Sequence, residues 1–235
     1  MVNEQADETL SNLLLEHIGR FRISFAKVME RVFDGQGDIA AAIRTLKDAK
    51  RIKSLGRAEG YGTVFGGYTA YQLSPQGAAH TGFSVKRSKS FSPTALEGHF
   101  RVLWLCCMGE DRFARLEEHH VHKLFDHPLN SKDCPYCMEI GGMRRVYRVR
   151  LLGADSADDY AIRDTRNDMQ EYGALPVVKD FVEHGRFGTM LVVSMPERRK
   201  RLEERFQAER LKECGHVRIA QVPDLNQIKE VLRDR

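Results

Sequence analysis

The chain has no long hydrophobic run, and none of its apolar stretches approaches the roughly 18 residues that a membrane-spanning helix needs. Its first eight residues, Met1–Glu8, are acidic and polar, which is unlike a secretory signal peptide. These two observations predict a cytoplasmic protein that has no membrane partner.

Cysteine is scarce, and the five that occur are odd in number and unevenly spaced. Such a set predicts thiols or metal ligands rather than a disulfide framework. Cys134 and Cys137 form a Cys-x-x-Cys pair, and the preceding His119 and His122 lie one turn apart on a predicted helix. This pattern fits a structural zinc site, a redox dithiol, or side chains that bind no cofactor, and we expect the last of these.

An excess of charge of either sign is also lacking, because 37 basic residues face 33 acidic ones. The distribution of charge along the chain is more informative than the net charge. Between Arg44 and Arg57 there are six basic residues against one acid, and a second basic cluster spans Lys86–Lys89. The tract Arg198–Arg201 is followed by Glu203 and Glu204, so we interpret it as a solvated helix face.

The first 83 residues have the pattern of a winged helix-turn-helix. Apolar residues recur at helical spacing in three segments, of which the third is Asp38–Arg51. A short strand at Ile52–Leu55, the glycine-rich stretch Gly56–Gly67 and a second strand at Tyr68–Leu73 then predict a hairpin wing. Ser74 and Pro75 have the residue types that begin a further helix.

The segment Asp38–Arg51 is the predicted recognition helix. Asp38 is its N-cap, an apolar stripe runs along one face, and basic residues occupy the other. Such a helix fits the major groove of duplex DNA. The predicted DNA-contacting residues, from this helix, the wing and the segment that follows, are Arg44, Thr45, Lys47, Lys50, Arg51, Lys53, Arg57, Lys86, Arg87 and Lys89. A protein-interaction module is the alternative reading of the same three helices.

Residues 84–94 are polar and basic and are predicted to be a linker. After them, residues 95–235 alternate helical and strand patterns, which predicts a small α/β domain. The predicted fold class of the whole chain is therefore α/β in the broad sense, or α+β, with a DNA-binding domain at 1–83.

The order of elements resembles the replication-relaxation family and the related MobC-type plasmid mobilization proteins. The resemblance rests on the signature Tyr71-Gln72-Leu73-Ser74-Pro75-Gln76-Gly77 and on Leu96-Glu97-Gly98-His99, and it spans about Leu13 to Leu225. It implies a second domain with a restriction-endonuclease-like, PD-(D/E)xK fold. In nucleases of that type, two carboxylates hold a divalent metal ion and a lysine positions the attacking water.

By position, Tyr136 and Arg148 stand where the resemblance places the two metal-binding acids. The second domain is therefore expected to be an inactive nuclease-like domain. A DNA-nicking relaxase remains the enzyme alternative, with Tyr136, Asp155 and Asp158 as its candidate catalytic residues and Mg²⁺ or Mn²⁺ required only in that case. Asp155 and Asp158 also stand where acids favour a helix N-terminus.

These patterns together predict a sequence-specific duplex DNA-binding protein of a mobile genetic element. It would act at a transfer origin, a replication origin or an operator, as a regulator or accessory factor, with other mobilization or replication proteins as further partners. A palindromic site would favour a homodimer. The alternatives are the relaxase and a protein–protein adaptor.

Overall fold

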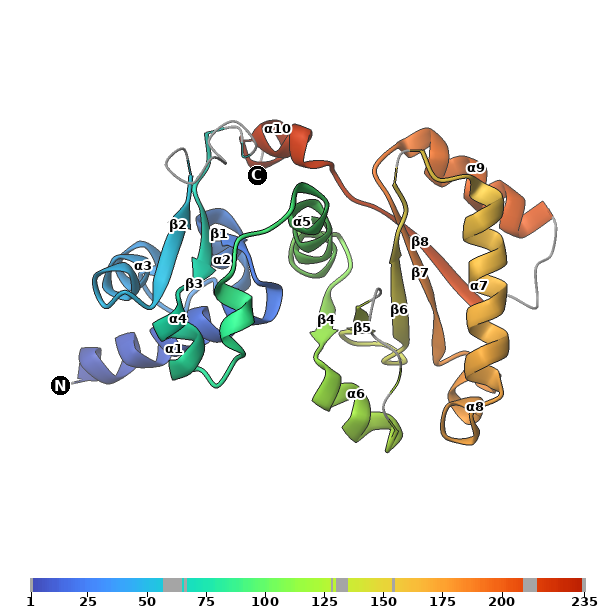
Figure 1. The fold of residues 1–235 in the computed structure, drawn as a ribbon, viewed down its shortest axis with the longest axis horizontal. Helices are drawn as coiled ribbons and strands as arrows, with labels where there is room; N and C mark the ends of the chain where they lie inside the picture. The colour runs from blue at the N-terminus through green and yellow to red at the C-terminus, as the bar shows by residue number, and fades with distance from the viewer. Residues whose placement is uncertain are drawn as a thin grey trace. The chain divides into compact units, whose positions relative to one another are not determined.

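The computed structural model describes residues 2–56, 65, 67–127, 129, 135–153, 155–208 and 215–233, with side chains described from residue 9 onward except at 229, 231 and 233. It is 53% helical and 18% strand, which confirms the predicted α+β class. The chain divides into two units, Met1–Met108 together with Pro223–Arg235, and Gly109–Val222 (Figure 1). Among the described residues, no helix is both long and apolar enough to cross a bilayer.

The first unit begins with three helices and a small antiparallel sheet, whose strands lie in the order β1-β3-β2. Its elements are α1 (Val2–Phe21), β1 (Ser24–Phe25), α2 (Ala26–Val32), α3 (Ile39–Asp48), β2 (Ile52–Leu55), β3 (Ala70–Leu73), α4 (Pro75–His80), the 3₁₀ helix η2 (Val85–Ser88), α5 (Pro93–Cys107), the 3₁₀ helix η4 (Leu225–Gln227) and α10 (Ile228–Arg233). Three helices followed by a returning pair of strands were expected from the sequence.

One hydrophobic core joins α1, α3 and the sheet. Leu14 and Ile18 of α1 pack with Ile43 and Leu46 of α3 and with Ile52 of β2, and all five are buried. The apolar residues lie three or four positions apart along each helix, so they share one face. Burial of each such side chain stabilises the fold by about 1.5–3 kcal/mol. This core leaves the opposite face of α3 toward solvent.

The segment Ser84–Lys89, called the strap below, is not a linker. Four consecutive carbonyl groups of the strap accept hydrogen bonds from side chains of the sheet and of the turn before it. Lys53 donates to the Ser88 carbonyl at 2.7 Å, Gln72 to those of Arg87 and Lys89 at 2.8 Å each, and Arg22 to that of Lys86 at 3.2 Å. Helix α5, which follows, contacts α1 and α2 and belongs to the first unit. The predicted linker at 84–94 is therefore corrected, and the first unit extends to Met108.

His17 lies within the core of the first unit. Its Nε2 lies 2.9 Å from Ser24 Oγ, and its ring contacts the rings of Phe21 and Phe33. Burial, together with the positive charge of Arg20, lowers the pKa of His17 from 6.5 to about 3. The imidazole is therefore neutral in the folded protein at neutral pH.

The buried imidazole predicts a pH dependence of stability. Because the pKa of His17 is about 3 in the folded state and near 6.5 in the unfolded state, the unfolded chain binds the proton first as pH falls. His17 therefore lowers the free energy of unfolding by about 1.4 kcal/mol per pH unit below the unfolded pKa. Urea unfolding of wild type and His17→Gln should show a steeper acid slope in the wild type. The control is His122→Gln, which replaces an exposed histidine and should keep the wild-type slope. Equal slopes in wild type and His17→Gln would contradict the neutral, buried state of His17.

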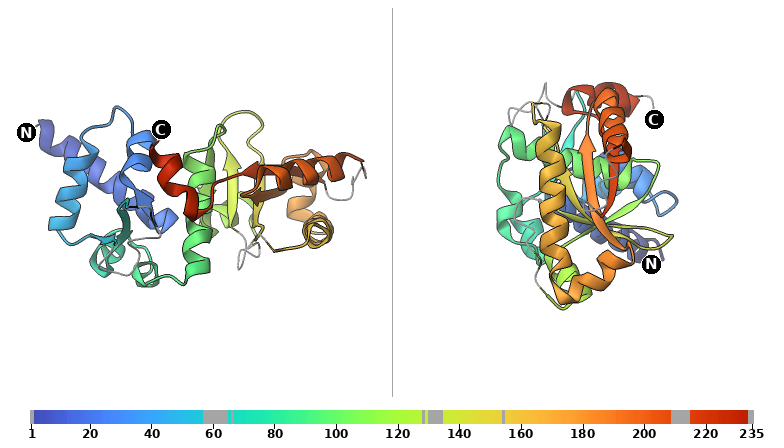
Figure 2. Two further views of the ribbon diagram at one scale, coloured as in Figure 1. Left: turned by 90° about the horizontal axis from the view of Figure 1, so that it is seen from above. Right: turned by 90° about the vertical axis from the view of Figure 1, so that its right-hand side faces the viewer.

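The second unit is a five-stranded mixed sheet in the order β4-β5-β6-β7-β8 (Figures 1 and 2). Neighbours from β4 to β6 are antiparallel, and neighbours from β6 to β8 are parallel. Its elements are β4 (Phe113–Leu116), α6 (Glu118–Phe125), β5 (Tyr136–Glu139), β6 (Val146–Leu151), α7 (Asp158–Gly173), α8 (Pro176–Glu183), β7 (Phe187–Val193), α9 (Pro196–Ala208) and β8 (His216–Gln221).

Helices α7, α8 and α9 pack on one face of this sheet. Tyr172 of α7 and Val178 of α8 lie against Phe187 of β7, and Leu202 of α9 packs near Leu191 of the same strand. Phe187 and Leu191 are four residues apart in a strand, so they point to the same face. Parallel strands need such helical crossovers, whereas β5 and β6 are joined by a tight hairpin.

Candidate nucleic-acid interface

Helix α3 has one buried and one exposed face, as predicted. Ile39, Ala42, Ile43 and Leu46 are buried, whereas Arg44, Thr45 and Lys47 are exposed. Asp38 is the N-cap, and its Oδ1 accepts a hydrogen bond from the Ala41 amide at 2.9 Å. The ten residues of the helix span about 15 Å and present a polar, basic surface.

The C-terminal end of α3 holds a lysine in a left-handed conformation. The Lys50 amide donates to the Lys47 carbonyl and the Arg51 amide to the Leu46 carbonyl, both at 2.9 Å, while Lys50 has φ +53°. This pair of bonds is the Schellman motif, in which glycine usually occupies the left-handed position. A residue with a side chain there costs about 1 kcal/mol or more.

The signature Tyr71–Gly77 holds the start of α4 against the turn that follows α3. The Ser74 amide donates to the Arg51 carbonyl at 2.9 Å, and Ser74 Oγ caps α4 by accepting from the Gly77 amide at 3.0 Å. A Cβ atom on Gly77 would lie 1.9 Å from the Arg51 carbonyl oxygen. Only glycine therefore lets α4 pack against the turn that follows α3.

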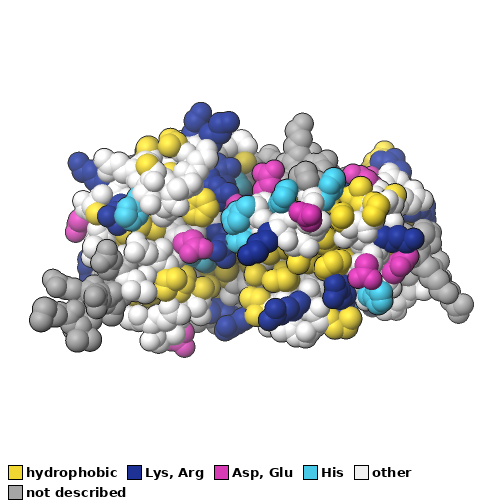
Figure 3. Space-filling view, turned by 90° about the horizontal axis from the view of Figure 1, so that it is seen from below, with side chains coloured by type: hydrophobic (Ala, Val, Ile, Leu, Met, Phe, Trp, Pro, Cys, Tyr) yellow, Lys and Arg dark blue, Asp and Glu magenta, His cyan; other side chains and the backbone are white. Residues whose placement is uncertain are grey.

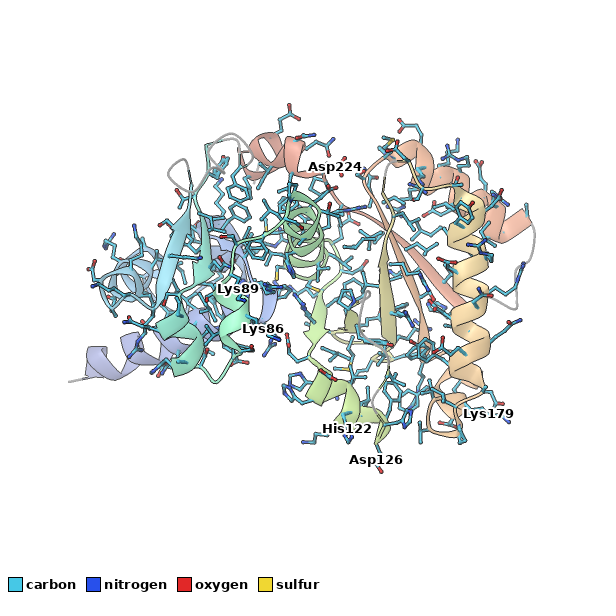
Figure 4. All side chains as sticks on the ribbon, viewed as in Figure 1. Lys86, Lys89, His122, Asp126, Lys179 and Asp224 are labelled. Carbon is cyan, nitrogen blue, oxygen red and sulfur yellow. The ribbon has the colours of Figure 1, made fainter. Side chains whose placement is uncertain are left out.

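The other predicted DNA-contacting residues differ in their availability. Lys53 and Arg87 are engaged within the protein, because Lys53 holds the strap and Arg87 donates to the Gly19 carbonyl at 2.6 Å. Arg51 donates to His80 Nε2 at 3.1 Å. Lys86 and Lys89 are exposed on the strap (Figure 4).

Arg57 lies outside the described residues. The exposed set that remains consists of Arg44, Thr45, Lys47, Lys50, Lys86 and Lys89.

In the second unit, Tyr136 and Arg148 are direct register partners on β5 and β6. Both are buried, and Tyr136 lies next to Tyr172 of α7, with 2.9 Å between the two hydroxyl oxygens. Arg148 donates to the Tyr172 hydroxyl and lies 3.5 Å from Asp168. Arg150 donates twice to the two carboxylate oxygens of Asp168, at 2.6 and 2.7 Å.

This polar network does not resemble an activated nucleophile. Tyr136 is 1% exposed, and burial and the hydrogen bond to Tyr172 raise its pKa far above the ordinary value. Arg148 and Arg150 both lie beside Asp168 and neutralise its charge. The geometry favours a structural role for the network.

Asp158 is also engaged in structure. It accepts from Arg198 at 2.9 Å and from Arg201 at 2.6 Å, which ties the start of α7 to α9. Burial raises the pKa of Asp158, but the hydrogen bonds from the two arginines outweigh it and hold the pKa below its ordinary value. Arg198 is 4% exposed, so the interpretation of Arg198–Arg201 as a solvated face is wrong at its first residue. Asp155 is exposed.

The predicted metal ligands are divided between different surroundings. Cys137 is buried in β5, whereas His119 and His122 are exposed on α6. Histidine side chains gather on the face seen in Figure 3, and Figure 4 shows His122 near the end of α6. Cys134 lies outside the described residues. Among the residues that are described, no three His, Cys, Asp or Glu side chains converge as a metal site.

A second polar cluster was not expected from the sequence. Tyr147 Oη lies 3.1 Å from His216 Nε2, and Arg218 forms ion pairs with Glu139 and Asp111. These residues come from β5, β6, β8 and the segment before β4, and they are up to 107 positions apart. No local spacing marks them, and only the sheet register brings them together. Tyr147 is buried, and burial raises its pKa, so it is not activated as a nucleophile.

No protein-family model, curated protein or solved structure matches the chain. The exposed basic face of α3 therefore carries the functional argument.

Proposed function

We propose that the chain is a cytoplasmic, sequence-specific duplex DNA-binding protein. In this proposal the first unit is a winged helix, α3 enters the major groove, and Lys86 and Lys89 of the strap contact phosphates. A helix of this size fits a groove about 12 Å wide, in which base edges present distinct patterns of donors and acceptors.

The observation that carries the proposal is the state of the cations on α3. In the described part of the chain, no side-chain hydrogen bond or ion pair engages Arg44, Lys47 or Lys50. By contrast, Arg199 of α9 is paired with Glu203 one helical turn away. Cations that the fold leaves exposed on one helix face are suited to an anionic partner, and a duplex offers regularly spaced phosphates.

Lys50 gives this reading an independent support, because the left-handed position would be less strained with glycine. Lys50→Gly is expected to raise the free energy of unfolding by about 1 kcal/mol. It should also weaken DNA binding, because one phosphate contact is lost, and lower the salt slope by about one unit. Urea unfolding and fluorescence anisotropy measure the two effects. If the variant gains stability and keeps its DNA affinity, Lys50 does not contact the DNA.

The second unit is proposed to be a nuclease-like domain that has lost its catalytic acids. Support comes from its topology, in which three antiparallel strands lead through α7 to a parallel fourth strand, as the family resemblance implies. Its role would be further DNA contact or homodimerisation. The wider proposal, from the same resemblance, is a regulator or accessory factor at an operator or origin of a mobile element.

An adaptor that binds only protein predicts no DNA affinity. The affinity of the full chain for a labelled duplex, measured by anisotropy at low and moderate salt, separates the two functions. Binding through phosphates should weaken roughly tenfold or more over that range. The absence of binding at low salt would overturn the proposal, and strand cleavage abolished by Tyr136→Phe would replace it with the relaxase.

A further inference from the structure

The hairpin between β5 and β6 presents two apolar side chains to solvent at its tip. Ile140 is 58% exposed and Met143 52% exposed, and the turn between them is Gly141-Gly142. Both glycines have positive φ values, +97° and +52°, which side chains rarely adopt. The turn therefore requires its glycines, and it places the two apolar side chains on either side of them.

The base of this hairpin is well fixed. The Ile140 amide donates to the Arg112 carbonyl at 3.0 Å, and the Glu139 amide donates to the Arg145 carbonyl at 2.9 Å. Arg145 Nε donates to the Gly185 carbonyl at 2.9 Å, and its guanidinium lies 3.2 Å from Met143 Sδ. Hydrogen bonds to the residues just before β4 and β7 therefore hold the tip in place, while its apolar side chains remain in water.

Positive charge surrounds the tip. Arg112 and Arg144 are exposed, and no side-chain hydrogen bond or ion pair engages either of them in the described part of the unit. Of the nearby acids, Asp111 and Glu139 are ion-paired with Arg218, and Glu110 is exposed.

Arg144 repeats the strain seen at Lys50, because it has φ +51° where glycine or asparagine would be less costly. The tip thus combines exposed isoleucine and methionine with an arginine that is held in a strained conformation.

We propose that this hairpin is an apolar wedge that inserts into the minor groove of duplex DNA. Isoleucine and methionine are among the side chains that enter between base steps and kink the duplex, and arginines bind the flanking phosphates and the narrow groove. The inference rests on the proposed DNA-binding function and assigns the second unit a task of its own, the bending of the bound DNA.

The test uses the full chain and a duplex labelled with a dye at each end, so that anisotropy reports binding and energy transfer reports bending. Wild type should bring the ends together. The double variant Ile140→Ser, Met143→Ser should lose that change in energy transfer and bind roughly tenfold more weakly. The matched control is Val177→Ser, Met195→Ser, which removes two other exposed apolar side chains of the same unit and should behave as wild type.

A second variant tests the charge without risk to the turn. Arg144→Gly suits the positive φ and should retain or raise stability, yet it should weaken binding several-fold and lower the salt slope. Thermal unfolding shows that each variant is folded.

The outcomes separate the two proposals. If wild type binds the duplex and the double serine variant bends it equally, the wedge is refuted while the function of α3 stands. If the double variant instead converts a dimer to a monomer in sedimentation, the tip is a contact between copies and the wedge is refuted. If wild type does not bind the duplex at low salt, both proposals fail.

Discussion

Replacing Arg44 and Lys47 together by alanine is expected to weaken binding to the preferred DNA site by roughly a hundredfold or more. Both residues lie on the exposed face of α3, one helical turn apart, so they reach the same stretch of groove. A bidentate base contact contributes about 1–3 kcal/mol of discrimination, and a lost phosphate contact adds to this. Titrations with the preferred duplex and with an unrelated duplex measure the loss of base discrimination and the loss of phosphate binding.

The matched control is Arg199→Ala, Lys200→Ala on α9. These cations also lie on an exposed helix face, but each lies within 4 Å of a glutamate one turn away. Their removal is expected to change affinity by less than about threefold. An equal loss in both double variants would mean that charge alone drives binding, and α3 would not be the recognition helix.

Replacing Asp168 by alanine is expected to lower the free energy of unfolding of the second unit by about 3–5 kcal/mol. Asp168 is 3% exposed and accepts two hydrogen bonds from Arg150, and Arg148 lies within 3.5 Å of it. Without the carboxylate, the buried Arg148 would lose the negative charge beside it, and the half-buried Arg150 would keep only the more exposed Asp164. Thermal and urea unfolding, followed by circular dichroism, measure the loss.

Asp164→Ala provides the control, because Asp164 is 40% exposed and lies 3.4 Å from the same arginine. Its removal should cost under about 1 kcal/mol. A fully apolar substitution, Arg148→Met, Arg150→Met, Asp168→Leu, should be less damaging than Asp168→Ala alone, since no charge is left buried. If Asp168→Ala is as stable as wild type, the network is not structural, and a role in binding must be considered for it.

The parts of the fold that follow local rules could be predicted from the sequence. Asp38 caps α3 and Ser74 caps α4 as expected, because a capping side chain bonds to amides two or three residues away. The apolar stripe of α3 identified its buried face by the same local periodicity. Lys50 was included among the basic residues, but its left-handed conformation depends on the Schellman bonds and could not be read from composition.

Long-range contacts could not be predicted. The strap has the composition of a linker, but hydrogen bonds from Arg22, Lys53 and Gln72, which lie 15 to 64 residues away, hold it in place. Tyr136 and Arg148 stand where the family resemblance places two metal-binding acids. In the structure they are register partners on β5 and β6. Their partner Tyr172 lies on α7, 24 and 36 residues farther along the chain, and no spacing in the sequence marked it.

Selection of bound fragments from random duplex DNA tests the central claim most directly. The wild-type chain should enrich one sequence motif, with two-fold symmetry if it binds as a dimer. The Arg44→Ala, Lys47→Ala variant should lose that enrichment while it keeps weak, salt-sensitive binding. Failure of the wild-type chain to enrich any sequence, or enrichment of the same motif by the variant, would contradict the assignment of α3 as the recognition helix.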